Sequence, residues 1–362
     1  MTDSSPRVAV PGRDLRRVAI LMGGISPEHP VSLASGCGVF ANIDRTRYEP
    51  FPVLISRAGV WIWPGGPAAF PETLTVAEAE AWIDNPPEGW VKAALGNMLR
   101  IPQAEVFFIA LHGVGGEDGT LQEYLEAMGQ PFTGSGAAAS RAAMDKIRSK
   151  ELYRAHGIPT APWLVLPHGT SGTAAADRVE RELGLPAVVK HPTGGSSIGV
   201  AVVKTRGELE KALAEIGAEA PELLVEAFVA GREATCGVLE GARVALPPTE
   251  IRPKRDGFFS FEEKYTQNGA DEITPAEFPP EVNDAIRRFA AKAHAALGLS
   301  VYSRTDFIWT GGHPENGGLF ALETNNLPGM TPKSILPQQA AAIGMTYTEL
   351  VTHVIERSLA EA

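Results

Sequence analysis

The chain has 362 residues, of which 44% are hydrophobic and 21% charged, and its formal net charge is −11. This length is too great for one ordinary hydrophobic core, so we expect two or three domains of globular composition. The acidic balance argues against a nucleic-acid partner, because phosphate backbones require a basic surface. No apolar run approaches the length of a membrane span, and two distant cysteines, Cys37 and Cys236, do not indicate disulfides, so we expect a cytoplasmic protein without a membrane partner.

The N-terminal third alternates apolar runs with glycine loops. Residues 1–16 lack the apolar centre of a signal peptide and are expected to form a loose lead. The run RVAILMGG at 17–24 is typical of a buried strand, and helical spacing follows Pro30. Further strands are predicted at YEPFPVLIS, GVWIW and EVFFIALHG and helices at TVAEAEAWI and TLQEYLEAMG, while residues 84–101 fit no clear pattern. This repetition predicts an α/β domain with a site at its strand ends.

The pattern changes after residue 135, where AAASRAAMDKIRSKELYRAHG predicts one long helix. The strands LPAVVK and VAVVK flank the loop HPTGGSSIG, and a Gly/Ser-rich loop between two strands predicts a flap over a ligand rather than a tight hairpin. Further strands are expected at ELLVEAFV (222–229), around GVLEG and ARVALPP, and at VYSRTDFIW and LFALETN. A polar loop at 253–276, a helix near 280–297 and closing helices complete the prediction.

The strands SRTDF and LETNN carry polar side chains. Side chains alternate along a strand, so Arg304 and Asp306 share one face. Glu323 and Asn325 likewise share a face. If the strands are neighbours, this face is either a solvated surface with a salt bridge or a site for a hard cation such as Mg²⁺, beside an arginine that faces phosphate or an oxyanion. The apolar pattern of both strands indicates burial and favours the cation site.

Other loops leave their alternatives open. The backbone of KHPTGGSSIG can close over phosphate or form a mobile hairpin, and it matches neither a dinucleotide fingerprint nor a P-loop. Lys190 needs a partner when buried, and phosphate is a good one. Glu28 either favours a helix N-terminus or binds an ammonium. His112 lies in LHGVGGEDG, which is a turn or a ligand site, and FSFEEKYTQNG is a surface loop or a lid.

Together these motifs identify a family. The stretches GGISPEHPVSLASG, LHGVGGEDGTLQ, FTGSG…MDKIRSK, GGSSIGV, FEEKY, SRTDF and ETNNLPGMT follow the order and spacing of the D-alanine–D-alanine ligases, and the chain resembles that family over residues 17–357. The resemblance implies an α/β fold of the ATP-grasp type, with ATP held between the second and third of three α/β subdomains. The implied divisions are a lead at 1–16, an N-terminal domain at 17–134, a central subdomain at 135–226, and a C-terminal subdomain at 227–362 with a lid loop at 256–272.

The resemblance also implies the site residues. ATP is expected to contact Lys146, Lys190, Gly195, Ser197, Glu226, Ala227, Phe228, Val229 and Glu233. Two Mg²⁺ or Mn²⁺ ions are expected on Asp306, Glu323 and Asn325. The implied catalytic residues are Glu28, which holds the first ammonium, its hydrogen-bonded partners Ser196 and Tyr265, and the oxyanion donors Arg304 and Gly329. The implied substrate-binding residues are His112, Lys264, Ser334 and Ile335.

The implied reaction joins two D-alanines through an acyl phosphate for peptidoglycan precursor synthesis, in a homodimer. Departures from the family pattern occur at His191, Gly194, Asn326 and Pro332-Lys333, and the last pair leaves the second substrate open. One alternative is a relative that joins D-alanine to D-lactate or D-serine, although such enzymes usually lack the pair found here as Lys264-Tyr265. Others are an ATP-grasp ligase of secondary metabolism and a two-lobed binding protein without catalysis, which the intact cation set disfavours.

Overall fold

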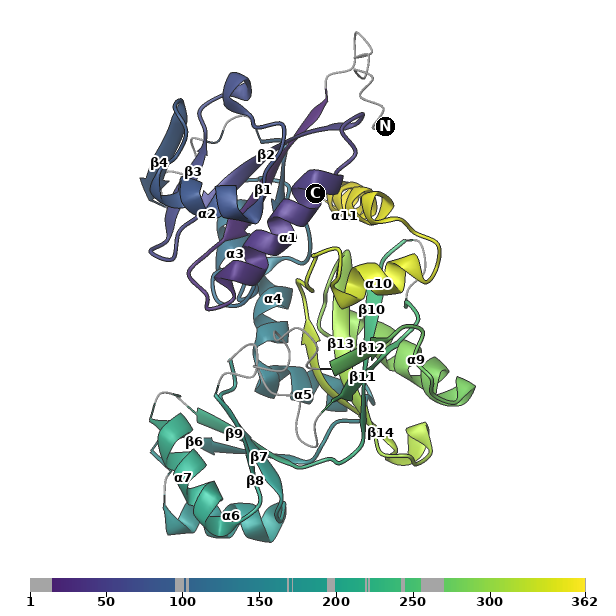
Figure 1. Ribbon diagram of the computed structural model, residues 1–362. Helices are drawn as coiled ribbons and strands as arrows, with labels where there is room; N and C mark the ends of the chain where they lie inside the picture. The colour runs from purple at the N-terminus through teal and green to yellow at the C-terminus, as the bar shows by residue number, and fades with distance from the viewer. Residues whose placement is uncertain are drawn as a thin grey trace.

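The computed structural model describes residues 15–94, 101, 104–167, 169–170, 172–193, 199–218, 220, 222–241, 245–254 and 270–361. Five predicted site residues lie outside this part of the chain, as does most of the predicted lid: Gly195, Ser196, Ser197, Lys264 and Tyr265. The described residues form three β-sheets with flanking helices, which confirms the α/β class (Figure 1). The exact domain boundaries stay a prediction.

The N-terminal sheet has the strand order β4-β3-β2-β1-β5. Its strands are β1 (Arg16–Gly23), β2 (Tyr48–Ile55), β3 (Val60–Pro64), β4 (Trp90–Ala94) and β5 (Val106–Ile109). Strand β1 lies between β2 and β5 and pairs in parallel with both, and its apolar run from Val18 to Met22 is fully buried. Helices α1 (His29–Asn42), α2 (Val76–Asp84) and α3 (Thr120–Ala127) and the 3₁₀ turn η1 (Pro67–Ala69) belong to this part. Strand β4 lies in the stretch that the sequence pattern left unassigned.

The prediction of one long helix after residue 135 is wrong. The structure has α4 (Ala137–Met144) and α5 (Lys146–Ala155), separated at Asp145. The Asp145 backbone is extended, and its carboxylate accepts hydrogen bonds from the N–H groups of Ile147 and Arg148. An aspartate that caps a new helix in this way satisfies otherwise unpaired donors, so it favours a break over continuation. Lys146 therefore lies in the first turn of α5.

The central sheet has the antiparallel order β6-β9-β7-β8. Its strands are β6 (Trp163–Pro167), β7 (Ala187–Lys190), β8 (Val200–Val203) and β9 (Glu222–Ala227). Helices α6 (Thr173–Glu182) and α7 (Arg206–Gly217) cover one face and share a hydrophobic core with it, as Figure 1 shows. The other face is thus available to line a site.

The C-terminal sheet has the antiparallel order β12-β11-β10-β13-β14. Its strands are β10 (Arg232–Leu239), β11 (Thr249–Pro253), β12 (Ala270–Ile273), β13 (Tyr302–Trp309) and β14 (Leu319–Asn325). The 3₁₀ turn η3 (Pro314–Asn316) precedes β14, and α9 (Pro280–Ala296) packs on β10 and β13. Two predictions are corrected here: residues 245–248 of ARVALPP are not a strand, because Pro247 and Pro248 lack N–H donors, and β12 interrupts the predicted polar loop.

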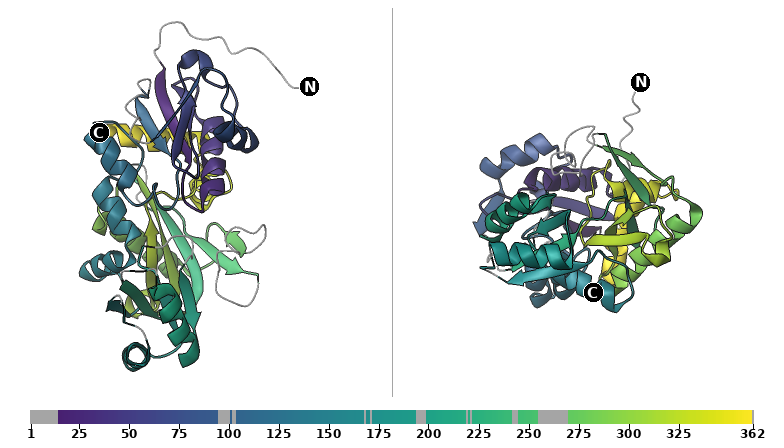
Figure 2. Two further views of the ribbon diagram at one scale, coloured as in Figure 1. Left: turned by 90° about the vertical axis from the view of Figure 1, so that its left-hand side faces the viewer. Right: turned by 90° about the horizontal axis from the view of Figure 1, so that it is seen from below.

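The end of the chain returns to the N-terminal sheet. After α10 (Ile335–Ala341), helix α11 (Tyr347–Glu361) contributes Leu350, Val351 and Val354 to the N-terminal core. Its Glu356 pairs with Arg47 at 2.9 Å and also accepts from the Tyr48 hydroxyl. Figures 1 and 2 show α11 beside α1, far along the molecule from the central sheet. Among the described helices, none combines the length and apolarity needed to cross a membrane.

Candidate active site

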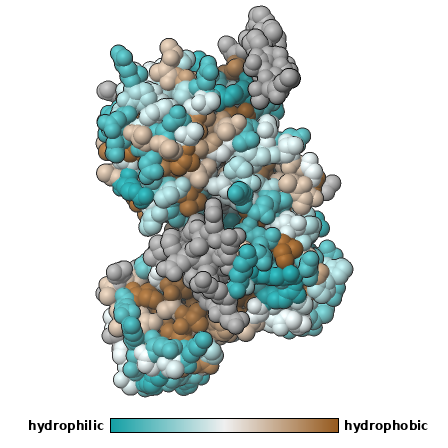
Figure 3. Space-filling view, in the orientation of Figure 1, coloured by the Kyte–Doolittle hydropathy of each residue, from teal (hydrophilic) through white to brown (hydrophobic). Residues whose placement is uncertain are grey.

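One cavity of about 1020 Å³ collects the predicted site residues. Every predicted site residue that the structure describes lines it, although these residues come from all three sheets. The central sheet contributes an apolar patch to the wall, made of Val188, Val200, Val202 and Phe228, next to the charged side chains of Lys190 and Glu226. Figure 3 shows apolar side chains gathered on this part of the molecule. Such an apolar patch suits a flat ring, whereas the part of the wall formed by the C-terminal sheet is charged.

The charged wall is built by β13 and β14, which are neighbours as the sequence pattern predicts. Arg304 pairs with Asn325 in the strand register and Asp306 with Glu323, so all four side chains share one face. Arg304 Nε lies 3.3 Å from Asp306 Oδ1, and Asn325 Nδ2 lies 3.5 Å from Asp306 Oδ2. Thr235 of β10, which the sequence reasoning missed, donates to Asp306 Oδ1 at 2.5 Å. Asp306 is therefore held rigidly.

This wall fits a hard divalent cation. Asp306, Glu323 and Asn325 offer carboxylate and amide oxygens, which are the ligands that Mg²⁺ and Mn²⁺ prefer. A positive charge already lies beside these oxygens, because Lys146 Nζ is 3.2 Å from Glu323 Oε2. Within the described ranges, no group of three or more His, Cys, Asp or Glu side chains could hold a metal ion. The set therefore fits a cation that takes its remaining ligands from phosphate and water.

A second ion cluster lies between β7, β9 and α5. Glu226 is 3% exposed and pairs through one oxygen with Lys190 and through the other with Lys150. Burial alone would raise the pKa of Glu226, but Lys190 and Lys150 hold it at about 2. The partner that buried Lys190 requires is thus Glu226 in this structure, where the sequence suggested phosphate.

Lys150 is a residue that the sequence reasoning missed. It is fully buried, lies over the Trp163 ring at 5.3 Å, and donates to Thr160 Oγ1 at 2.6 Å. Burial lowers its pKa, although Glu226 acts in the opposite direction. Lys150 follows Lys146 by four residues on the same helix, and this spacing on one helical face was the available signal.

Glu28 lies between β1 and α1, at the opposite end of the cavity. It is the N-cap residue of α1, but its side chain makes no capping hydrogen bond, so any benefit to the helix would come from its charge. Gly113 lies against it with φ +68°, and a Cβ on Gly113 would be 2.8 Å from Glu28 Oε2. Only glycine leaves room for this carboxylate and readily adopts that backbone conformation.

The loop after β5 places the buried His112 and the half-buried Glu117 near Glu28. Burial lowers the pKa of His112, which favours a neutral ring, and its Nε2 lies 3.0 Å from Ser35 Oγ. Burial, with the Glu28 carboxylate, raises the pKa of Glu117 to about 8, and Glu117 accepts a hydrogen bond from Gly113 N–H at 2.8 Å. The stretch LHGVGGEDG, which the sequence left open between a turn and a ligand site, thus brings Glu117 into the cavity wall.

The loop after β14 closes the site. Gly329, Ser334 and Ile335 line the cavity, and Ser334 precedes α10. Ser334 Oγ lies 2.7 Å from Thr331 Oγ1 and accepts from the Thr331 N–H at 3.0 Å. The chain thus folds back on itself at the place where the second substrate is expected.

Comparison with known proteins places nearly the whole length of the chain in one family. Residues 17–135 match the family model for the D-ala D-ala ligase N-terminus, and residues 152–356 match that for the C-terminus. The D-alanine–D-alanine ligase of Leptospira biflexa is 38% identical, with 95% of this chain and 99% of that protein covered. That of Citrifermentans bemidjiense is 38% identical over 94% of this chain and 95% of its own length.

Solved structures of the same family superpose on nearly the whole chain. The D-alanine–D-alanine ligase of Coxiella burnetii matches with a TM-score of 0.80 at 26% identity, covering 96% of this chain and 95% of that one. The Bacillus anthracis enzyme complexed with ATP matches with a TM-score of 0.72 at 30% identity, covering 96% and 98%. The VanG D-Ala:D-Ser ligase of Enterococcus faecalis matches with a TM-score of 0.80 at 28% identity, covering 95% and 100%. The chain belongs to the D-alanine–D-alanine ligase family and has its ATP-grasp fold.

Proposed function

We propose that this protein joins two molecules of D-alanine to D-alanyl-D-alanine with ATP, in the cytoplasm, for peptidoglycan precursor synthesis. The observation that carries the proposal is that Glu28, the lysines Lys146 and Lys190, and the polar set of Asp306, Glu323 and Asn325 all line one cavity. The curated relatives support D-alanine as both substrates, since they are named D-alanine–D-alanine ligases. A D-serine acceptor is the less favoured alternative, and the VanG enzyme represents it. We also propose a homodimer.

The nucleotide is proposed to lie between the central and C-terminal sheets. Its ring would lie against the apolar patch and the Glu226–Val229 segment, with Glu233 toward the ribose. Lys146 and Lys190 would contact the phosphates through their ammonium groups, which commonly bind phosphate in proteins. Two divalent cations held by Asp306, Glu323 and Asn325 would neutralise charge on the transferred phosphoryl group.

The remaining groups are assigned to the amino acids. Glu28 would hold the ammonium of the first D-alanine, so that its carboxylate points toward the phosphates. Arg304 and the Gly329 N–H would stabilise the oxyanion that forms when the second amine attacks the activated carbonyl. Ser334, Ile335 and Lys264 would hold the second D-alanine, and His112 would contribute to substrate binding. Ser196 and Tyr265 would join Glu28 in a hydrogen-bonded set that excludes water.

The test is phosphate release from ATP with D-alanine, D-serine and D-lactate, with the products identified by mass spectrometry. The wild-type protein should form D-alanyl-D-alanine as the main product, and the Glu323→Ala variant should lose turnover. In thermal unfolding, ATP with Mg²⁺ should stabilise the wild-type protein and not this variant. Glu315→Ala is the control, because Glu315 pairs with Arg288 on the surface. Normal turnover by Glu323→Ala would refute the cation assignment. A main product that contains D-lactate or D-serine would refute D-alanine as the second substrate.

A further inference from the structure

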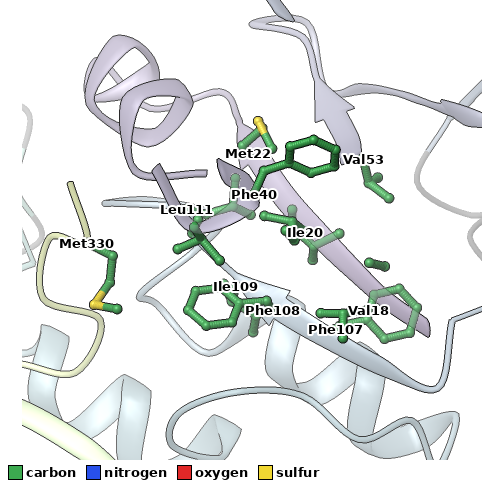
Figure 4. Close-up of a cluster of buried hydrophobic side chains, with 14 of the residues drawn as sticks. Val18, Ile20, Met22, Phe40, Val53, Phe107, Phe108, Ile109, Leu111 and Met330 are labelled. Atoms are coloured by element: carbon green, nitrogen blue, oxygen red, sulfur yellow. The ribbon is translucent and has the colours of Figure 1, made fainter. Parts of the chain in front are cut away.

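The loop that carries Gly329 is anchored in the N-terminal domain, although it follows a strand of the C-terminal sheet. Its Met330 side chain is 1% exposed and belongs to the hydrophobic core that the N-terminal sheet shares with C-terminal residues such as Leu239 and Tyr302. Figure 4 shows Met330 on this loop at the edge of the cluster that includes Ile109 and Leu111. The residue next to Gly329 therefore packs in the core where the domain that supplies Glu28 meets the C-terminal sheet.

Both backbone groups of Met330 are held by side chains from outside the loop. Its N–H donates to Ser35 Oγ of α1 at 3.4 Å, and its carbonyl accepts from the Tyr347 hydroxyl at the start of α11. The loop also lies directly on α1, because a Cβ on Gly38 would be 3.0 Å from Pro332 Cδ. The loop is thus held by hydrogen bonds from Ser35 and Tyr347 and by a packing contact with α1.

Ser35 links this loop to His112. Ser35 is completely buried, and its Oγ lies 3.0 Å from His112 Nε2. The His112 ring also hydrogen-bonds the backbone of Leu327, and this bond raises the pKa of the ring. A backbone carbonyl that accepts a ring N–H has this effect. A neutral ring that donates to Leu327 accepts from the Ser35 hydroxyl, and that hydroxyl in turn accepts from the Met330 N–H. This chain of hydrogen bonds holds the loop on both sides of Pro328-Gly329.

We propose that Ser35 and Tyr347 are positioning residues, which fix the Gly329 N–H relative to Glu28. Ser35 lies seven residues after Glu28, which is two helical turns and about 10 Å along α1. One helix therefore begins beside the proposed ammonium site and also holds the proposed oxyanion donor. Donors of this kind act through preorganisation, and small displacements of reacting groups reduce rates strongly. This inference rests on the proposed function, because it concerns the geometry of that reaction.

The test compares Ser35→Ala with Ser32→Ala. Both serines are completely buried on α1, but Ser32 donates to the Ala110 carbonyl and accepts from the Gly23 N–H, away from the loop. In the ligand-free protein, hydrogen exchange of the peptide covering residues 327–334 should be two- to tenfold faster in Ser35→Ala, the change expected from about one lost hydrogen bond, and unchanged in Ser32→Ala. Ser35→Ala should lower kcat and kcat/KM for D-alanine together by a similar factor and leave KM for ATP unchanged.

A second variant keeps the proposal testable if Ser35→Ala folds poorly. Tyr347→Phe removes the tie to the Met330 carbonyl and should show the same faster exchange and reduced kcat. Unchanged exchange and unchanged kcat in either folded variant would overturn the positioning role. A kcat reduced as much in Ser32→Ala as in Ser35→Ala would overturn it too, because a general loss of core stability would then explain the effect. If the wild-type protein does not ligate D-alanine at all, the proposed function itself fails, which is a distinguishable result.

Discussion

The buried cluster of Lys150, Glu226 and Lys190 makes an asymmetric prediction about stability. Glu226→Gln removes the anion that both lysines contact, whereas Lys150→Met leaves a one-to-one pair between Glu226 and Lys190. Loss of a partner that leaves a buried charge uncompensated costs about 3–5 kcal/mol. In Lys150→Met no charge is stranded, so the loss is at most about 1.5–3 kcal/mol for the charged hydrogen bonds, offset by relief of the cost of burying an ammonium.

Thermal unfolding of the ligand-free protein measures this difference. At about 2–4 °C per kcal/mol, the Glu226→Gln midpoint should fall on the order of 10 °C and the Lys150→Met midpoint only a few degrees. The double variant should be more stable than the sum of the two losses predicts, because its members are in contact. Glu182→Gln is a matched control in the same subdomain, since its ion pairs with Arg178 and Arg181 are exposed and contribute little.

The pH dependence provides an independent check. The pKa of Glu226 in the folded protein is about 2, below the ordinary value of 4.5. Its contribution to stability is therefore complete above pH 4.5 and is lost as the pH falls toward 2. The stability difference between wild type and Glu226→Gln should shrink over that interval. If Glu226→Gln were no less stable than Lys150→Met at neutral pH, the two lysines would not depend on this carboxylate and the reasoning would be wrong.

Two further perturbations follow from the structure. Burial raises the folded-state pKa of Glu117 to about 8 from 4.5, so the wild-type protein should lose stability as the pH rises through this interval. In thermal unfolding, the Glu117→Gln variant should therefore become more stable relative to wild type from pH 5 to 8. A constant difference between the two proteins would contradict the raised pKa. Asp145→Ala removes the cap of α5 and should cost about 0.5–2 kcal/mol, whereas Asp145→Asn should retain most of it; equal stability of both variants would contradict the cap.

Strand periodicity was sufficient to predict the charged wall formed by β13 and β14. Alternation places Arg304 with Asp306 and Glu323 with Asn325, and the register of β13 and β14 then brings the two pairs together. The pattern could not show that Thr235 of β10 fixes Asp306, because that contact joins residues 71 positions apart. Local chemistry is encoded in short stretches, whereas the groups that hold it in place come from the packing of distant elements.

The same limit explains why the predicted secondary structure was wrong in places. The helix periodicity of residues 137–155 continues across Asp145, so only the capping geometry reveals the break. Similarly, burial chemistry predicts that Lys190 needs a partner but not which one, and the choice of Glu226 depends on how β7 pairs with β9. Ser35 has an unremarkable place in the sequence, and its contacts with Met330 and His112 arise only when three distant segments meet.

The cationic side chains of the cavity share one feature that bears on nucleotide binding. Lys146 faces Glu323, Lys190 faces Glu226, and Arg304 faces Asp306 in the structure. A phosphate that recruits a lysine must therefore compete with a carboxylate, and the released carboxylate would face anionic phosphate without compensation. A divalent cation held by Glu323 would resolve that conflict, because it would neutralise the carboxylate and leave Lys146 free to contact phosphate. Nucleotide and cation should consequently bind with strong mutual dependence, and neither should bind tightly alone.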